Sequence, residues 1–452
     1  MRTAAEVRTT LDQVLPGVRA DLERLVCIPS VSADPSARSH VEASAEEVVR
    51  QLEGAGLSEV EVLTERGGLP AVVGRRPGPP QAPTVLLYAH HDVQPVGDAG
   101  LWETDPFEPV ERGGRLYGRG AADDKAGIAL HCAALRALGS EPGVGVTVLV
   151  DGEEEIGSPS LPALLARHGD RLAGDVLVLA DSINWRVGVP ALTTTLRGGV
   201  SVVVEVRTLR HAVHNGAYGG PVPDALTALA RLLATLHDER GDVAVAGLSR
   251  GDADPLDLSE ETLRADAGVL DGVRLIGSGT LTSRLWAGPA LSVVGIDAPA
   301  VDDSGMVLVP SARARLALRI GPGDDAAAAR DALVAHLHEH APWGASVSVT
   351  AGAPVAPYSA VTSGPAYAAV RAAYEDAWGT PPVEIGVGGS IGFLAPFAAA
   401  FPQAEILVTG IEDPDTRAHA PNESLHLADF ERACLAEALL LDRISQWPPG
   451  TR

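Results

Sequence analysis

Short, continuous runs of apolar residues alternate with helical patterns over the first 180 residues and again near the C-terminus. The apolar runs cover residues 71–73, 84–88, 144–150 and 175–180, and a 3.6-residue period of apolar positions covers 3–27, 39–54 and 124–138. A strand without a polar face has to be covered on both sides, as strands of a parallel sheet are. We therefore predict an α/β fold in which a mainly parallel central sheet is flanked by helices.

The pattern changes after about residue 190, where strands alternate between polar and apolar positions. These strands are expected at 200–207, 291–296, 311–320 and 345–350, with helices at 223–239 and 324–341. Antiparallel strands with two helices are typical of a small α+β domain. At 452 residues the chain is also too long for one ordinary core. We predict one α/β domain formed by residues 1–192 and 355–452, with an α+β domain, 193–354, inserted into it.

The charge of the chain limits its partners. The formal net charge is −24, and a strongly anionic protein is repelled by phosphate backbones and by anionic lipid surfaces. We expect neither nucleic acid nor membrane as a partner. The three cysteines form neither a zinc-ribbon spacing nor a disulfide framework, and the N-terminal residues lack a hydrophobic signal core, so we expect a cytoplasmic protein.

Histidines and carboxylates gather where predicted strands end and loops begin. The residues are His90, Asp92, Asp123, Glu154, Glu155, Asp181 and His419. Imidazole and carboxylate groups are ligands for divalent zinc, cobalt and manganese. Three carboxylates and two imidazoles from this set are too many ligands for one tetrahedral ion, but they suit two ions that share a bridging carboxylate.

Each of these motifs also has a simpler interpretation. Positions 90 and 92 point to the same face of a strand, so Asp92 can orient a metal-bound His90, but the pair can also be a polar strand end. One residue of Asp123-Asp124 can cap a helix while the other binds metal. Three consecutive glutamates, 153–155, can form a solvated acidic loop, although like charges this close repel one another unless cations are present. The order of the motifs along the chain favours the metal site.

The series of motifs resembles the di-zinc metallopeptidase family that includes carnosine-type dipeptidases, bacterial tripeptidases, aminoacylase and related deacylases. The matching segments, in the order of that family, are residues 28–32, 90–95, 116–125, 154–158, 214–220, 388–391 and 419–423. The resemblance implies a catalytic α/β domain and an inserted lid domain through which two copies form a homodimer. It also implies two divalent ions per subunit, expected to be Zn²⁺, with Mn²⁺ or Co²⁺ as alternatives.

The resemblance assigns roles to individual residues. One ion would be held by His90 and Asp181 and the other by Glu155 and His419, with Asp123 bridging them. Glu154 would be the general base, Asp92 would orient His90, and the peptide bond between Asp123 and Asp124 would be cis. In the lid, His214 would reach the partner subunit's active site and Arg319 would bind the substrate carboxylate. Ser390, in a glycine-rich turn, would also contact substrate, although the residues around this turn depart from the family pattern.

Asp181 and Tyr218 resemble the dipeptidase subgroup, because deacylases and carboxypeptidases tend to have Glu at the first position. We therefore predict hydrolysis of the amide bond of dipeptides. An N-acyl amino acid deacylase or a carboxypeptidase of the same family is the alternative. Gly388-x-Ser390-x-Gly392 also matches the nucleophile turn of serine hydrolases, with His419 or His426 downstream. A non-catalytic metal-binding protein is a third possibility, disfavoured by the presence of both Asp92 and Glu154.

Overall fold

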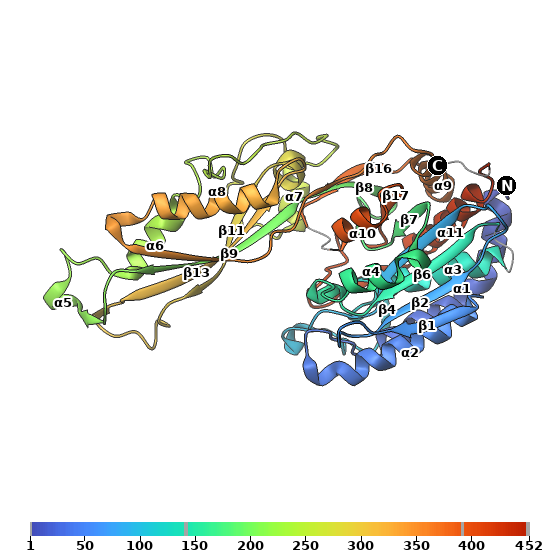
Figure 1. Ribbon diagram of the computed structural model, residues 1–452, viewed down its shortest axis with the longest axis horizontal. Helices are drawn as coiled ribbons and strands as arrows, with labels where there is room; N and C mark the ends of the chain where they lie inside the picture. Colours follow the sequence, from blue (N-terminus) through green and yellow to red (C-terminus); the bar gives the residue numbers. More distant parts are fainter. Residues whose placement is uncertain (1, 140–142, 390–392, 449–452) are drawn as a thin grey trace. The chain divides into compact units, whose positions relative to one another are not determined.

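A computed structural model describes residues 2–139, 143–389 and 393–448 (Figure 1). The chain divides into two compact units. Unit 1 contains Met1–Thr194, Ala360–Ile385 and Gly392–Arg452, and unit 2 contains Thr195–Ser359 and Gly386–Ile391. Within the described ranges, no helix is both long enough and apolar enough to cross a lipid bilayer.

A mixed sheet, most of whose strands belong to unit 1, forms the centre of that unit. Among the described residues it has nine strands in the order β1-β2-β6-β3-β7-β17-β8-β15, with β16 also paired to β8. The strands are β1 (Glu59–Leu63), β2 (Ala71–Arg76), β3 (Thr84–His90), β6 (Gly145–Asp151), β7 (Val176–Leu179), β8 (Ala191–Leu196), β15 (Tyr358–Ser359), β16 (Val383–Val387) and β17 (Glu405–Thr409). The four central neighbours, β6, β3, β7 and β17, run parallel to one another. The mainly parallel sheet predicted from the apolar runs is confirmed.

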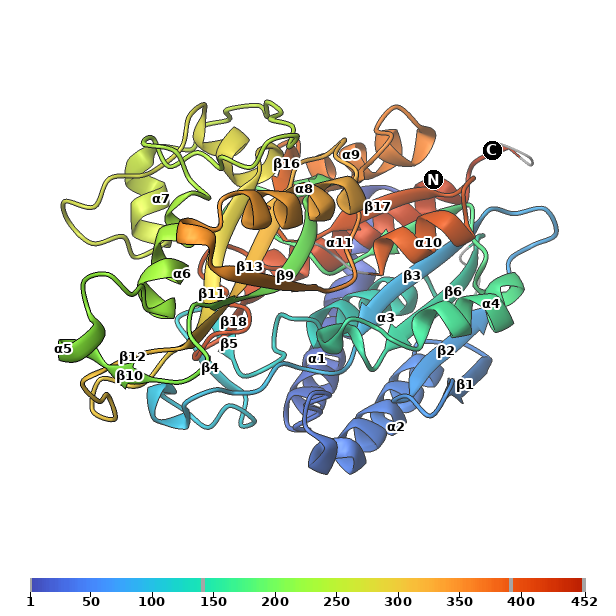
Figure 2. The same ribbon diagram turned by 60° about the vertical axis from the view of Figure 1, so that its left-hand side comes forward.

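Helices cover both faces of this sheet (Figures 1 and 2). One face carries α1 (Ala4–Val26), α2 (Arg38–Gly54), α3 (Lys125–Leu138), α9 (Pro365–Trp378) and α11 (Leu427–Ile444), and the other carries α4 (Leu161–Leu172) and α10 (Leu394–Ala400). Strands β6 and β7 are buried along their whole length, because helices lie on both sides. A smaller sheet in the order β18-β5-β4 joins Ser424–His426, Arg115–Tyr117 and Val110–Arg112.

The single lysine of the chain is part of this framework. Lys125 is fully buried at the start of α3, and its Nζ donates hydrogen bonds to the carbonyl oxygens of Leu25, at 2.8 Å, and Ile28, at 2.7 Å. A helix leaves its last carbonyl groups without partners inside the helix. Lys125 therefore secures the end of α1 against the loop that contains Asp123 and Asp124.

Unit 2 is a four-stranded antiparallel sheet with helices on one face. Its order is β11-β13-β9-β14, formed by Ala290–Asp297, Ser311–Ile320, Gly198–Arg207 and Ser346–Ala351. Helices α6 (Ala225–Ala234) and α8 (Ala326–Glu339) pack against alternate residues of β9 and β13, which form a separate hydrophobic core. The unit also contains β10 (Val213–His214), α5 (Asn215–Tyr218), α7 (Glu260–Asp266) and β12 (Val307–Leu308).

The element boundaries differ from the predictions in a few places. The helix expected at 223–239 ends at Ala234, and the stretch after it contains the unpredicted α7. Helices α4, α9 and α10 and the edge strand β1 were also not predicted from the sequence. Strand β1 is partly exposed on both faces, so its sequence lacks the apolar run that marks the buried strands.

Candidate metal centre

The predicted ligands of unit 1 meet at one edge of the central sheet. His90 is the last residue of β3, Glu154 and Glu155 follow β6, Asp181 follows β7, and His419 lies in the loop after β17. These four strands are neighbours and parallel, so their carboxyl ends lie side by side. This edge is where ligands bind in open α/β sheets. Asp123 enters from the loop that precedes α3.

Two overlapping clusters of candidate ligands result. Nitrogen and carboxylate oxygen atoms of His90, Glu154 and Asp181 lie within 4.8 Å of one another, and so do those of His90, Asp123 and Glu155. His90 Nε2 is 3.1 Å from Asp123 Oδ1 and 4.0 Å from Asp181 Oδ1. His419 Nε2 lies 2.9 Å from Asp123 Oδ2 and 3.3 Å from Glu155 Oε2. Asp123 thus lies between the two imidazoles, one on each carboxylate oxygen.

Asp92 organises the centre without belonging to either cluster. Its Oδ1 lies 3.5 Å from His90 Nδ1, on the side of the ring opposite Asp123. Its carboxylate also accepts hydrogen bonds from the backbone N–H groups of Glu154, at 3.2 Å, and Glu155, at 3.1 Å. Asp92 therefore links the histidine at the end of β3 to the two glutamates after β6.

The adjacent residues Asp123 and Asp124 do different things. The Asp124 carboxylate caps α3 through the N–H of Gly127 and also accepts a hydrogen bond from the N–H of His90. The peptide bond between the two aspartates is cis, as the resemblance predicts. Asp123 faces His90 and His419. Asp124 therefore caps the helix, and Asp123 contacts both imidazoles.

The three consecutive glutamates also separate. Glu153 is turned away from the centre, where its carboxylate accepts hydrogen bonds from Leu69 N–H, Ser160 N–H and the Ser160 hydroxyl. Glu155 is held by Gln94, whose side-chain amide donates to Oε2 at 2.8 Å and whose backbone N–H donates to Oε1 at 3.1 Å. Among the residues that the structure describes, no hydrogen-bond donor contacts the Glu154 carboxylate, which leaves its oxygens available for a substrate or a water.

Crowded carboxylates shift the pKa values of the centre. Burial and the carboxylates of Glu155 and Asp123 raise the pKa of Glu154 to about 7, against the opposing effect of His90. Burial, with Glu154 and Asp123 nearby, raises the pKa of Asp181 well above its usual range. Hydrogen bonds to Asp123 and Glu155 raise the pKa of His419 to about 11. Burial opposes the charged form of His90, but hydrogen bonds to Asp123 and Asp92 outweigh it and raise the pKa of His90 well above its usual range.

This donor set fits divalent cations. Four carboxyl groups, Asp123, Glu154, Glu155 and Asp181, and two imidazoles converge, so the centre has more acidic than basic groups. Bound cations would neutralise the excess and displace the protons from the imidazoles and carboxylates. Oxygen and imidazole nitrogen ligands without thiolates suit zinc, cobalt or manganese.

The predicted substrate-binding residues of the lid belong to unit 2. His214 is exposed at the junction of β10 and α5, and its Nδ1 accepts a hydrogen bond from the N–H of Gly216 at 3.0 Å. Arg319 is half-buried near the end of β13, where it pairs with Gly199 of β9 and Ala290 of β11. Ser390 lies outside the described residues.

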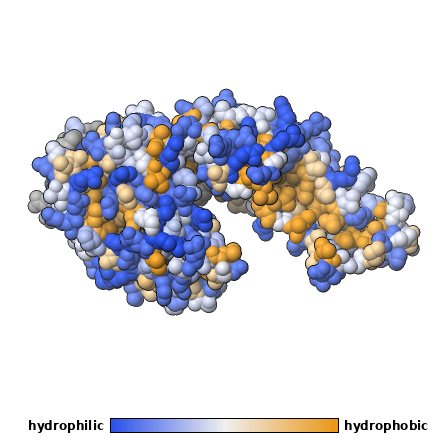
Figure 3. Space-filling view, turned by 180° about the vertical axis from the view of Figure 1, so that it is seen from behind, coloured by the Kyte–Doolittle hydropathy of each residue, from blue (hydrophilic) through white to orange (hydrophobic). Residues whose placement is uncertain are grey.

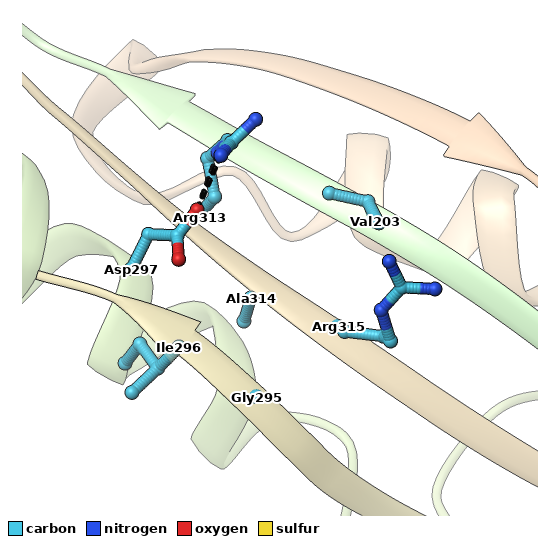
Figure 4. Close-up of a pocket in the computed structure, with 7 residues that line it drawn as sticks. All are labelled: Val203, Gly295, Ile296, Asp297, Arg313, Ala314 and Arg315. Atoms are coloured by element: carbon cyan, nitrogen blue, oxygen red, sulfur yellow. Dashed lines mark hydrogen bonds and ion pairs between the residues drawn. The ribbon is translucent and has the colours of Figure 1, made fainter. Parts of the chain in front are cut away.

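A pocket of about 170 Å³ opens on the helix-free face of the lid sheet (Figure 4). Arg313 and Asp297 form an ion pair across it, and Arg315 lies beside Val203 and Gly295. It contains none of the predicted metal ligands. The candidate active centre is therefore the ligand cluster of unit 1 and not this pocket.

Two residues with clear structural roles at the centre received no role in the sequence prediction. Gln94 holds Glu155, and Glu423 accepts hydrogen bonds from the loop that contains Asp123. Both lie within segments that match the resembled family, four residues after His90 and four after His419. Their closeness in sequence to a proposed ligand could have marked both residues as part of the centre. Only the structure shows what each side chain contacts.

Comparison with known proteins agrees with this geometry. The model of Peptidase family M20/M25/M40 matches residues 86–443. The chain belongs to this peptidase family. It is a metallopeptidase, and the resemblance predicted from the sequence is confirmed. A serine hydrolase centred on Ser390 is not favoured.

The relatives that match include dipeptidases. The Cysteinylglycine-S-conjugate dipeptidase of Corynebacterium striatum is 35% identical over 430 residues, which cover 93% of this chain and 94% of that protein. The Cys-Gly metallodipeptidase of Candida albicans is 27% identical, with 94% of each chain covered. The fold of human carnosine dipeptidase 1 matches with a TM-score of 0.85 at 23% identity, covering 99% of this chain and 100% of that one.

Proposed function

We propose that this metallopeptidase is a dipeptidase that uses two divalent metal ions. The convergence of two histidines and four carboxylates at the carboxyl ends of β3, β6, β7 and β17 is the observation that carries the proposal. The two relatives compared above by sequence are dipeptidases, and each matches more than nine-tenths of the chain. The alternative, an N-acyl amino acid deacylase or a carboxypeptidase of the same family, is not favoured by these relatives.

The proposed ligands divide into two sets that share Asp123. His90 and Asp181 would hold one ion, and Glu155 and His419 the other. The contacts of Asp123 support a bridging role, because each of its carboxylate oxygens faces a different histidine. Divalent ions in this centre would lower the pKa of a nearby water and polarise the scissile carbonyl. Zinc is the proposed native metal, and manganese and cobalt suit the same donors.

Glu154 is the proposed general base and acid. Its carboxylate lies within the first cluster, and no hydrogen-bond donor among the described residues occupies its oxygens, so it can accept a proton from a water in the centre. It would then give that proton to the amine that leaves as the amide bond breaks. Asp92 is the proposed positioning residue, because it orients the His90 ring and fixes the backbone on which Glu154 and Glu155 lie.

The proposed active unit is a homodimer formed through the lid. Strand β11 is an edge strand of the lid sheet, and Val293, Val294 and Ile296 are 47%, 57% and 53% exposed. Figure 3 shows hydrophobic side chains over much of the visible surface of unit 2. An exposed edge strand with apolar side chains favours pairing with another chain. In this dimer His214 would act in the partner subunit's site, and Arg319 and Ser390 would bind the substrate's end.

A cytoplasmic location is part of the same proposal. Cys27, Cys132 and Cys434 are all free, and the latter two are buried. Free thiols agree with a reducing compartment.

The first test concerns metal content. Protein purified without chelators should contain close to two equivalents of divalent metal per chain by inductively coupled plasma mass spectrometry. Prolonged dialysis against a chelator should abolish hydrolysis, because no ion would remain to activate the water and polarise the scissile carbonyl, and added zinc, manganese or cobalt should restore it. A fully active protein that retains one equivalent or none would contradict the two-ion centre.

The second test concerns substrate class. We expect dipeptides with a free amino terminus to be hydrolysed faster than N-acetyl or N-succinyl amino acids, because Asp181 occupies the position that resembles the dipeptidases. The measurement is kcat/KM over a panel of dipeptides, tripeptides and N-acyl amino acids with each of the three metals. A higher kcat/KM for any N-acyl amino acid than for every dipeptide would show that the protein is a deacylase and not a dipeptidase.

A further inference from the structure

A buried ion pair lies directly behind the candidate metal centre. Glu423 and Arg119 are 0% and 1% exposed, and Arg119 Nη1 donates to Glu423 Oε2 at 2.6 Å. The same carboxylate accepts three backbone hydrogen bonds, from Gly120 at 3.0 Å to Oε2 and from Ala122 at 3.0 Å and Asp123 at 3.1 Å to Oε1. One side chain thus holds four donors that lie between residues 119 and 123.

These donors belong to the loop that presents Asp123, whereas Glu423 belongs to the segment that presents His419. The backbone of Glu423 strengthens the connection, because its carbonyl oxygen accepts a hydrogen bond from Gly118 N–H at 3.1 Å. The Arg119 guanidinium also donates, at 3.4 Å in each case, to the carbonyl oxygens of Pro95 and Ala420. The Arg119–Glu423 pair therefore contacts three segments: the one that follows His90, the one that contains Asp123 and the one that contains His419.

The energetics of the pair favour a positioning role over a stabilising one. Removing a carboxylate and a guanidinium from water costs several kcal/mol per ion, and their attraction often does no more than offset this. A well-packed apolar pair would fill the same space without that cost. What an apolar pair could not do is fix backbone N–H groups in defined directions, as the charged and nearly saturated Glu423 carboxylate does.

We propose that Glu423 and Arg119 are positioning residues that set the separation of Asp123 and His419, and thereby the affinity of the centre for its metal ions. This inference rests on the proposed ligand assignment. Asp123 Oδ2 and His419 Nε2 are 2.9 Å apart; Asp123 belongs to the loop that the Glu423 side chain binds, and His419 lies four residues before Glu423 in the same segment. Loss of such outer contacts to metal ligands typically lowers metal affinity by about 10- to 100-fold.

Glu423→Gln tests the inference, because glutamine has the same shape but turns an NH₂ group toward backbone donors and removes the charge that faces Arg119. Metal-free proteins would be titrated with zinc in competition with a chromogenic chelator. The visible spectrum of the cobalt-loaded protein would report ligand geometry. We expect zinc affinity to fall about 10- to 100-fold and the cobalt bands to shift. Arg119→Gln should do the same, and the double variant should lose little more than either single one.

Glu65→Gln is the matched control. Glu65 is a buried carboxylate, 8% exposed, whose side chain pairs with Arg167 at 3.0 Å and His168 at 3.3 Å, both on α4 and outside the three ligand-bearing segments. This variant should lower the melting temperature of the metal-free protein and leave zinc affinity and the cobalt spectrum unchanged. If circular dichroism shows that the Glu423→Gln variant is unfolded, Glu423→Asp replaces it. This variant keeps the charge but shortens the side chain by one methylene, and the same changes in zinc affinity and cobalt spectrum are expected.

The outcomes distinguish the positioning role of Glu423 and Arg119 from the proposed two-ion centre on which it rests. Wild-type zinc affinity and an unchanged cobalt spectrum in the Glu423 variant would overturn the positioning role. An affinity loss matched by the Glu65 control would overturn it equally, because it would show a general effect of lost stability. If instead the wild-type protein binds fewer than two zinc ions, the proposed two-ion centre itself fails.

Discussion

Glu154→Gln is expected to lower kcat by about 10²- to 10⁴-fold while both metal ions stay bound. The substitution removes a carboxylate that can accept and return a proton but removes none of the five proposed ligands. The backbone N–H of Glu154, which donates to Asp92, is unchanged, so the His90 side of the centre should keep its geometry. Steady-state hydrolysis of a dipeptide, together with metal analysis of the same preparation, measures both parts of the expectation.

Glu153→Gln is the matched control for this variant. It makes the same chemical change one residue earlier in the chain, but the Glu153 carboxylate binds Leu69 and Ser160 away from the centre. We expect reduced stability from the weakened hydrogen bonds and near-normal kcat in the folded protein. Near-normal turnover by the Glu154 variant, or loss of a metal ion from it, would show that Glu154 is not the base.

The buried parallel strands were predictable because each is marked by its own residues. Val85 to Ala89 of β3 carry no charged or amide side chain, and Thr147 is the one polar residue between Val146 and Val150 of β6, a composition typical of strands covered on both faces. Strand β1 alternates glutamate with valine and lies at the sheet edge, where this signal is weak. The order of the strands in the sheet is a property of contacts between distant segments, so the sequence alone could not provide it.

The identities of the candidate ligands followed from position after strands and from the resembled family, but their supporting contacts did not. Nothing in the sequence distinguishes the three glutamates 153–155 by chemistry, yet the fold turns Glu153 toward Ser160 and presents Glu154 and Glu155 to the centre. The role of Glu423 was equally hidden, because its partners are about 300 residues away in sequence.

The lid histidine gives the second large expected effect. His214 Nδ1 accepts the N–H of Gly216, so in the neutral ring the proton must lie on Nε2. An exposed imidazole with a fixed Nε2–H is suited to donate a hydrogen bond to an oxyanion. His214→Ala should therefore lower kcat by about 10²- to 10³-fold, the usual cost of removing one oxyanion donor. His211→Ala, which removes another exposed histidine of the same loop, should have little effect.

The proposal that His214 acts in the partner subunit's site makes a stronger prediction. His214→Ala and Glu154→Gln should each be nearly inactive alone, but a heterodimer of the two has one site with an intact Glu154 and an intact His214. After complete subunit exchange of an equimolar mixture, about half of the dimers are heterodimers with one competent site, so activity should recover to about a quarter of wild type, because an oxyanion donor and a general base contribute only when they meet in one site. Differently tagged chains and native mass spectrometry would verify the exchange. An exchanged mixture as inactive as its parents, or a fully active monomer, would show that each site uses only its own chain.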